Sequence, residues 1–175
     1  MGRDDQGIAN SKHRYQVIPR SLCFITYGDE VLLLRGGQHK RLWAGRYNGV
    51  GGHIEAGEDV HAATLREIVE ETGLAVHDLR LCGVVHADAG DPSVGILFFV
   101  FTAQTASREI GVSPDGTLEW WPIDHLPTAK MVEDLPVLLP KALAMQPDDP
   151  PFFAAYRYDE HDRLVMSFGG MRTAS

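Results

Sequence analysis

The chain has 175 residues, of which 44% are hydrophobic and 23% charged, and its formal net charge is −8. This length and balance predict one globular domain with a substantial core and leave little room for a second domain. The acidic charge argues against nucleic-acid polymers and anionic membranes as partners, and an acidic protein that handles anionic substrates needs cations to mediate.

No apolar run approaches the length of a membrane span, and the N-terminus carries no apolar signal core, so we expect a cytoplasmic protein. Cys23 and Cys82 each lie in an apolar, strand-like run. They are predicted to be buried, reduced thiols rather than a disulfide or part of a zinc site.

Residues 1–15 are polar and are predicted to be a disordered tail, which leaves 16–170 as a single domain. Residues 21–27 and 31–35 are apolar and predict two strands joined by a turn at Gly28, that is, a hairpin. Because both runs are almost continuously apolar, we expect a sheet that is covered on both faces.

A polar loop is predicted over residues 36–45. Its His39, Lys40 and Arg41 can contact a triphosphate, although a solvated loop is an equally good interpretation. Residues 46–52 then predict a short strand that enters a glycine-rich loop, where backbone can approach a ligand closely.

Residues 59–73 predict one helix, with Asp59 as its N-cap and Gly73 just beyond its C-terminus. At about 100° per residue, one side of this helix is apolar. It carries Ala62, Leu65, Ile68, Val69 and Thr72. The other side is acidic and carries Asp59, Glu67, Glu70 and Glu71.

The acidic side is crowded, because Glu67 lies three residues from Glu70 and four from Glu71. Like charges at these spacings cost roughly 0.2–0.5 kcal/mol per pair, and only Arg66 is close enough in sequence to offset them. A hard divalent ion, Mg²⁺ or Mn²⁺, would remove the repulsion and could also hold substrate phosphates. The alternative interpretation is a glutamate-rich helix face in solvent.

The second half of the chain predicts three more strands, a helix and a terminal hairpin. Strands are expected at 79–86, 95–103 and 118–122, a loop at 88–92, a helix at 136–145 and a hairpin from 152–158 to 163–168. The run at 95–103 is the most apolar, so we expect it to be central. Together the elements predict an α/β fold in which a mixed sheet lies between helices.

The spacing of the glycine loop and the acidic helix adds a family resemblance. The chain reads Gly52, five residues, Glu58, seven residues, Arg66-Glu67-Ile68, one residue, Glu70-Glu71, one residue, Gly73-Leu74. This pattern resembles the Nudix box at every defined position. The resemblance implies an α/β/α sandwich and the hydrolysis of a phosphoanhydride in a nucleoside diphosphate linked to a further group.

The resemblance also assigns roles to residues. It implies that Glu67, Glu70 and Glu71 bind the metal, Mg²⁺ or Mn²⁺, with the Gly52 carbonyl as an additional ligand. Arg66 is expected to orient Glu67, and Glu58 to support the site through Arg66 or water. Candidates for the general base are Glu67 and Glu70 within the box, and Asp115 and Glu119 outside it; Glu119 could instead complete the metal site.

The flanking segments are similar to the MutT-like branch of the family, which destroys oxidised purine nucleotides such as 8-oxo-dGTP. The segments are 46–52, 118–127, 131–134 and 152–168. In that branch an Asn before the box and a late carboxylate bind the base, which maps onto Asn48 and Asp134, with Glu133 beside it. An amide and a carboxyl can satisfy donors and acceptors on a purine edge.

The chain departs from some members of that branch by placing Val132-Glu133 where Trp and a small residue or Pro often stand. Trp120, Trp43 or Phe24 could supply the aromatic partner for the base instead. Two alternatives therefore stay open: a pyrophosphatase acting on ADP-ribose, a nucleotide sugar or a dinucleotide, and a nucleotide-sensing module without turnover. Either a monomer or a homodimer is compatible with the sequence.

Overall fold

The computed structural model describes residues 14–38 and 43–169, so the expected tail up to residue 13 and the basic residues His39, Lys40 and Arg41 lie outside the described residues. Within the described part the elements follow one another along the chain as expected for an α/β fold. They are β1 (Gln16–Tyr27), β2 (Glu30–Gly36), β3 (Tyr47–Asn48), α1 (Val60–Thr72), β4 (Val76–Asp91), β5 (Val94–Thr105), β6 (Gly116–Pro122), a 3-10 turn (Thr128–Lys130), α2 (Leu135–Leu143), β7 (Phe152–Tyr158) and β8 (Leu164–Gly169).

The strands form a single mixed sheet in the order β3-β2-β1-β5-β4-β7-β8, with β6 paired to β2. The pairs β1–β5 and β4–β7 are parallel, and the other pairs are antiparallel. The expected hairpins β1–β2 and β7–β8 are therefore confirmed. The most apolar strand, β5, lies in the middle of this order, as predicted.

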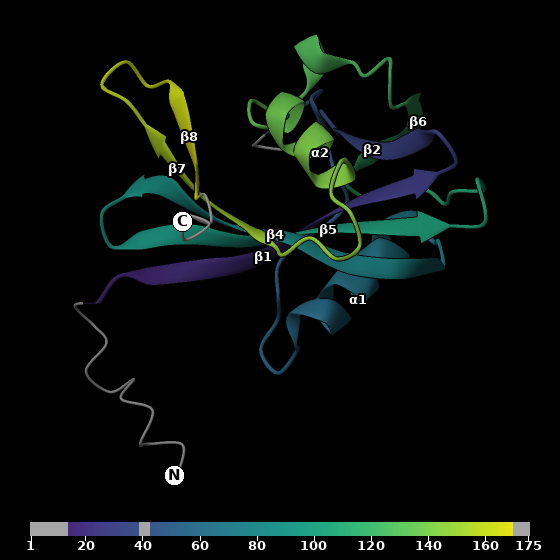
Figure 1. Cartoon of the computed structure of the whole chain (residues 1–175), viewed down its shortest axis with the longest axis horizontal. Helices are drawn as coiled ribbons and strands as arrows, with labels where there is room; N and C mark the ends of the chain where they lie inside the picture. Colours follow the sequence, from purple (N-terminus) through teal and green to yellow (C-terminus); the bar gives the residue numbers. More distant parts are fainter. Residues whose placement is uncertain (1–13, 39–42, 170–175) are drawn as a thin grey trace.

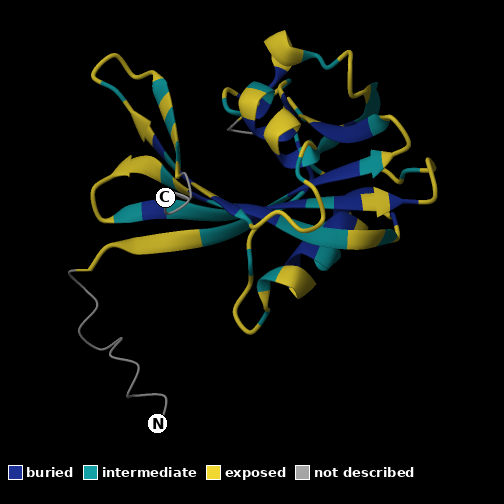
Figure 2. Cartoon of the chain, viewed as in Figure 1, coloured by how far each residue is buried: buried dark blue, intermediate teal, exposed yellow. Residues whose placement is uncertain are grey.

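One helix covers each face of the sheet: α1 lies on one side and α2 on the other (Figure 1). Side chains alternate along β1, so Phe24 joins the core beneath α2 while Cys23 and Ile25 join the core beneath α1. All three are fully buried, which confirms that this part of the sheet is covered on both faces. The fold is thus the predicted α/β/α sandwich, and Figure 2 shows the buried strands between its helices.

Both cysteines are buried and free, as expected. Burial raises the pKa of the Cys23 thiol, so this sulfur stays protonated at neutral pH. In residues 14–38 and 43–169 no helix is both long and apolar enough to cross a membrane.

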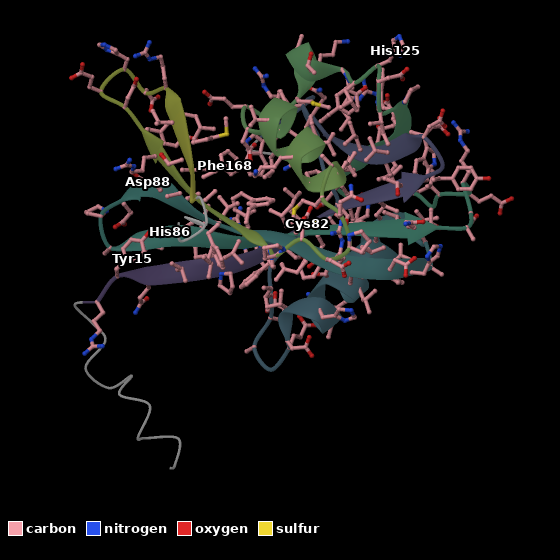
Figure 3. The ribbon with its side chains drawn as sticks, viewed as in Figure 1. Tyr15, Cys82, His86, Asp88, His125 and Phe168 are labelled. Atoms are coloured by element: carbon pink, nitrogen blue, oxygen red, sulfur yellow. The ribbon has the colours of Figure 1, made fainter. Side chains whose placement is uncertain are left out.

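The N-terminal strand is longer than predicted: β1 begins at Gln16 rather than at residue 21. Its first half holds Pro19 and Arg20, which interrupt the apolar run, and the strand is supported instead by parallel pairing with β5 from Val94 onward. Just before it, the Tyr15 hydroxyl lies 2.6 Å from His86 Nε2 of β4 (Figure 3).

The loop predicted at 88–92 is wrong, because β4 continues to Asp91 and β5 starts at Val94. The pairing of β4 with β5 changes register between Asp88 and Asp91, and this shift accommodates the polar residues. There Gly90 adopts a φ of 77° and donates its N–H to Asp88 Oδ1 at 2.8 Å. The strand is supported here by a local side-chain hydrogen bond and a glycine with positive φ, although it lacks the apolar alternation typical of strands.

The predicted ends of α1 are confirmed. Asp59 Oδ1 accepts the Ala62 N–H at 2.9 Å, and Gly73 closes the helix at φ 70° by donating its N–H to Val69 O. The second helix, α2, begins and ends close to the predicted limits and buries Leu135, Leu138, Leu139 and Ala142.

The predicted apolar face of α1 is partly wrong. The helix buries Ala63, Thr64, Ile68, Glu71 and Thr72, whereas Val69 is 58% exposed and Ala62 is exposed. The two threonine hydroxyls can be buried because they donate to carbonyls one turn earlier. Glu71 is drawn inward by a backbone donor in the glycine loop, so the buried face is rotated towards the carboxylates.

Candidate active site

Arg66 is the hub of a hydrogen-bond network that ties α1 to the glycine loop. Its Nε and Nη2 donate to the two carboxylate oxygens of Glu58 at 2.7 and 2.9 Å. Its Nη1 donates to Glu67 at 2.9 Å and to Glu70 at 3.0 Å, and Nη2 also donates to the His53 carbonyl at 3.1 Å. The expected contacts of Arg66 with Glu67 and Glu58 are therefore present.

This network fixes charges as well as geometry. The Arg66 guanidinium, followed by the Glu55 N–H, holds the pKa of Glu58 below its usual range. Glu58, and after it Glu67, raise the pKa of Arg66, which stays charged in any case. The bidentate pair with Glu58 fixes the orientation of the guanidinium, and its Nη1 in turn holds the Glu67 and Glu70 carboxylates by one hydrogen bond each.

Glu71 is the buried carboxylate of the site and is only 5% exposed. Its Oε2 accepts the Gly51 N–H at 2.9 Å. Burial raises the pKa of Glu71 to about 8; the Gly51 N–H opposes this shift, while the negative charges of Asp115 and Glu67 add to it. Glu67 and Asp115 therefore place their charges near Glu71, and both Glu67 and Glu71 lie against the Gly51–Gly52 backbone.

A Cβ at Gly52 would lie 2.5 Å from the Glu67 carboxyl carbon, so the Glu67 carboxylate would have to move if this position carried a side chain. The Gly52 carbonyl, the expected additional metal ligand, accepts the Ser21 N–H at 2.9 Å and so lies at the β1 side of the loop. The backbone and the glutamate are thus packed in direct contact.

These groups suit a hard divalent ion, since carboxylate and carbonyl oxygens are the ligands that Mg²⁺ and Mn²⁺ prefer. In the described parts of the chain, no three His, Cys, Asp or Glu side chains are already arranged as a metal site. Arg66 holds Glu67 and Glu70 through hydrogen bonds, and those carboxylates would have to turn towards Glu71 when an ion binds. The donor set fits the metal chemically.

A cavity of about 580 Å³ joins this acidic end to the expected base-binding end. Its lining residues include Gly52, Glu71 and Asp115 from the acidic site, and Asn48, Glu133 and Asp134 from the expected base-binding site. These six residues lie on five separate segments of the sequence, and the fold brings them to one cavity.

Asn48 and Asp134 of the expected base-binding site have polar groups that can bind a ligand. Asn48 Oδ1 accepts the Gly49 N–H at 2.9 Å, which leaves its amide nitrogen for a ligand. Asp134 stands at the N-cap of α2 without a side-chain capping bond, and burial raises its pKa. Glu133 differs from both, because its Oε1 already accepts the Leu164 N–H at 3.3 Å.

We compared the chain with known protein families and structures. The profile of the NUDIX domain matches residues 18–142, which is most of the chain. The chain belongs to the Nudix family. It is accordingly a Nudix hydrolase, an enzyme class that acts on nucleotide derivatives and generally uses divalent metal ions.

Two kinds of Nudix relative are similar to the chain. The oxidized purine nucleoside triphosphate hydrolase of Danio rerio is 27% identical over 83% of this chain and 89% of its own length. The enzyme of the same name from Mus musculus is 30% identical over 69% of this chain and 79% of its own length. The NAD-capped RNA hydrolase NudC of Pseudomonas aeruginosa is 34% identical over 66% of this chain, but over only 40% of its own length. Among solved structures, a MutT protein of Bacillus halodurans has a TM-score of 0.71 and 25% identity and covers 86% of this chain and 97% of its own.

Several predicted site residues do not line the cavity. Within the box these are Arg66 and the three glutamates that accept its hydrogen bonds, Glu58, Glu67 and Glu70. Outside the box it is Glu119. Its carboxylate accepts the Tyr47 hydroxyl at 2.7 Å and lies 3.1 Å from an Arg35 nitrogen. It is not among the residues that line the cavity. Of the two carboxylates outside the box, only Asp115 lies beside Glu71.

Of the three aromatic residues predicted to stack on the base, one lines the cavity and two do not. Trp43 lines the cavity, whereas Phe24 is fully buried in the core beneath α2. Trp120 packs with the other core, beneath α1, and donates its Nε1–H to the Arg108 carbonyl at 3.1 Å. Trp43 is therefore the predicted aromatic residue that can meet a ligand.

Sequence reasoning missed Arg20, Ser21 and Tyr156 as cavity residues. A signal was available for Arg20, because a charged residue interrupts a strand-like run. No comparable signal marked Tyr156, because its position in the predicted hairpin fits the ordinary alternation of side chains along a strand. Its ring packs edge-on against Phe98 and Phe168, at 5.9 and 6.5 Å between centroids; Phe168 is labelled in Figure 3.

Proposed function

We propose that this Nudix hydrolase cleaves a nucleoside triphosphate to a monophosphate and pyrophosphate, with an oxidised purine nucleotide of the 8-oxo-dGTP type as its preferred substrate. One observation carries the proposal: the same cavity is lined by Glu71 of the acidic helix and by Asn48 and Asp134. A nucleotide placed in it would present its base to polar groups at one end and its phosphates to carboxylates at the other.

Glu67, Glu70 and Glu71, with the Gly52 carbonyl, would hold Mg²⁺ or Mn²⁺. A bound divalent ion neutralises phosphate charge and makes water a stronger nucleophile. Arg66 would act as a positioning residue, because its guanidinium donates to Glu67 and Glu70 and so orients both carboxylates.

Proton removal from the attacking water falls to a carboxylate of the site. Glu67 and Glu70 lie on α1, and Asp115 reaches the cavity from the segment before β6. Glu70 has 58% of its side chain exposed, compared with 15% for Glu67, so Glu67 is the better shielded of the two box candidates. Shielding favours Glu67 because a base works best where bulk water does not compete.

Base recognition falls to Asn48 and Asp134, which supply amide donors and a carboxyl to a purine edge. A site that hydrogen-bonds particular base groups rejects an analogue that leaves those groups unpaired. The MutT-like and oxidized purine nucleoside triphosphate hydrolase relatives support this choice.

A second candidate function is cleavage of a dinucleotide or of ADP-ribose. The NudC relatives favour it, as they match about two thirds of this chain. The same acidic helix would act, but the products would be two nucleoside monophosphates or a monophosphate and a sugar phosphate, without pyrophosphate.

The proposal is tested by product analysis of a nucleoside triphosphate reaction with Mg²⁺, with EDTA, and with Glu67→Gln. We expect monophosphate and pyrophosphate only when metal is present, and a fall in kcat of about 100- to 1,000-fold in the variant, because the lost carboxylate acts on charge in the transition state. The variant Glu109→Gln changes an exposed carboxylate and should keep wild-type rates. Release of orthophosphate instead, or turnover in EDTA, would refute the proposed reaction.

A further inference from the structure

The described part of the chain has four buried side-chain polar atoms without a hydrogen-bond partner: Arg20 Nε, Ser21 Oγ, Trp121 Nε1 and Tyr156 OH. Three of them belong to residues that line the cavity of the site. Leaving a buried donor unpaired costs about 1–3 kcal/mol, so such groups collect where a ligand supplies the partner. Arg20 is the one of these that carries a charge.

Arg20 stands next to the glycine loop as well as on the cavity wall. Its backbone forms an isolated bridge with His53, and the following residue donates its N–H to the Gly52 carbonyl. Across the sheet it is paired with Phe98, which lines the same cavity. The guanidinium is therefore carried by the strand that borders the expected phosphate end.

Six other arginines among the described residues pair with groups of the protein, and two more, Arg14 and Arg157, are exposed, unlike the partly buried Arg20. Arg35, Arg66, Arg108 and Arg163 are ion-paired. Arg46 and Arg80 donate to backbone carbonyls. In residues 14–38 and 43–169, no carboxylate forms an ion pair with Arg20, although the chain carries an excess of acidic groups. Partial burial lowers the pKa of Arg20, as expected for a cation that is desolvated without an anion.

A guanidinium without a protein partner suits an anionic ligand, and its planar fork matches phosphate oxygens. We propose that Arg20 binds the phosphate chain of the substrate from β1, in addition to the divalent metal that the glutamates of α1 would hold. This inference rests on the proposed function and adds a residue to it. A phosphate chain held from both sides fits an enzyme whose own net charge would otherwise repel the substrate.

The experiment uses a phosphate chain without a base, Mg²⁺–tripolyphosphate, and measures its dissociation constant by calorimetry. We expect Arg20→Gln to weaken binding about 10- to 100-fold and Arg20→Lys to weaken it less, because Lys keeps the charge but loses the fork. Arg157→Gln is the matched control: it removes the same charge from an exposed position on β7 and should bind like the wild type. Thermal unfolding checks that each variant is folded.

Equal binding by the wild type and Arg20→Gln would overturn the inference, as would a wild type that does not bind the probe. A third result also overturns it: if Arg20→Gln binds tripolyphosphate normally but binds deoxyguanosine more weakly, the guanidinium contacts the base. If the variant loses tripolyphosphate binding while the wild type fails to hydrolyse nucleoside triphosphates, the proposed reaction fails and the role of Arg20 stands.

Discussion

At the scale of single residues, Asn48 is the residue on which base recognition depends. Replacing it with Ala should reduce the preference for an oxidised over a normal purine triphosphate by about 10-fold, because a paired donor is lost from a partly buried site. The measurement is the ratio of kcat/KM for 8-oxo-dGTP and dGTP.

A matched variant separates recognition from loop structure. Asn48→Asp keeps an acceptor for the Gly49 N–H and removes the amide donor. We expect it to lose discrimination as Asn48→Ala does. If Asn48→Asp discriminates like the wild type, the residue supports the loop rather than the base.

Tyr156 offers a test in which stability and binding should move in opposite directions. Its hydroxyl is buried without a partner, while its ring is packed on both sides. Tyr156→Phe should therefore leave the ligand-free protein as stable as before or up to about 1 kcal/mol more stable, and should raise KM severalfold. Thermal unfolding measures the change in stability, and steady-state kinetics measure the change in KM. A fall in Tm of many degrees would show that the Tyr156 hydroxyl has a hydrogen-bond partner in the ligand-free protein.

Residue-level prediction from sequence succeeded for the contact between Arg66 and Glu67 and was partly wrong for the buried face of α1. Spacing identified Arg66 and Glu67, whose contact is local along the helix. It could not show that Glu71 is buried and Val69 exposed, because a backbone N–H twenty positions away in the sequence decides which side of the helix turns inward.

At the scale of elements, the packing of α1 against the glycine loop makes stability depend on pH. Glu71 has a raised pKa of about 8 in the metal-free fold, compared with the ordinary carboxyl value of 4.5. Between these values the folded chain keeps a proton that the unfolded chain releases, so the free energy of unfolding should decrease as pH rises from about 4.5 to 8 and then level off.

Glu71→Gln removes this titration. The difference in Tm between the variant and the metal-free wild type should grow in favour of the variant over the same pH range. Thermal unfolding in EDTA across that range measures it. A constant difference at every pH would mean that Glu71 is ionised throughout or exchanges its proton equally in both states.

Elements formed by local signals were predicted best. The helix α1 has its own caps at Asp59 and Gly73, and the terminal hairpin has its own turn. The first half of β1 was missed, because Pro19 and Arg20 hide the strand and the parallel partner β5 lies about eighty residues away. Long-range pairing is the information that a local pattern lacks.

At the scale of the whole molecule, the fold was predictable because a long, specific box resemblance agreed with the order of elements. The cavity was only partly predictable. Asn48 and Asp134 came from the family resemblance, whereas Arg20 and Tyr156 reach the same hollow through strand pairings that the sequence does not display.

The chain's net negative charge and its acidic helix together predict stabilisation by a divalent cation. Saturating Mg²⁺ at pH 8 should raise Tm, since a ligand at 100 times its dissociation constant stabilises a fold by about 2.7 kcal/mol. NaCl at equal ionic strength controls for screening, and Glu71→Gln should reduce the gain. Equal effects of both salts would contradict a specific metal site.

The most direct test of the account is to compare kcat/KM for 8-oxo-dGTP, dGTP and ADP-ribose with Mg²⁺ at alkaline pH, identifying the products of each. We expect a strong preference for the oxidised nucleotide, with release of pyrophosphate. A preference for ADP-ribose would keep the metal-binding helix but contradict the assignment of Asn48 and Asp134 to an oxidised purine.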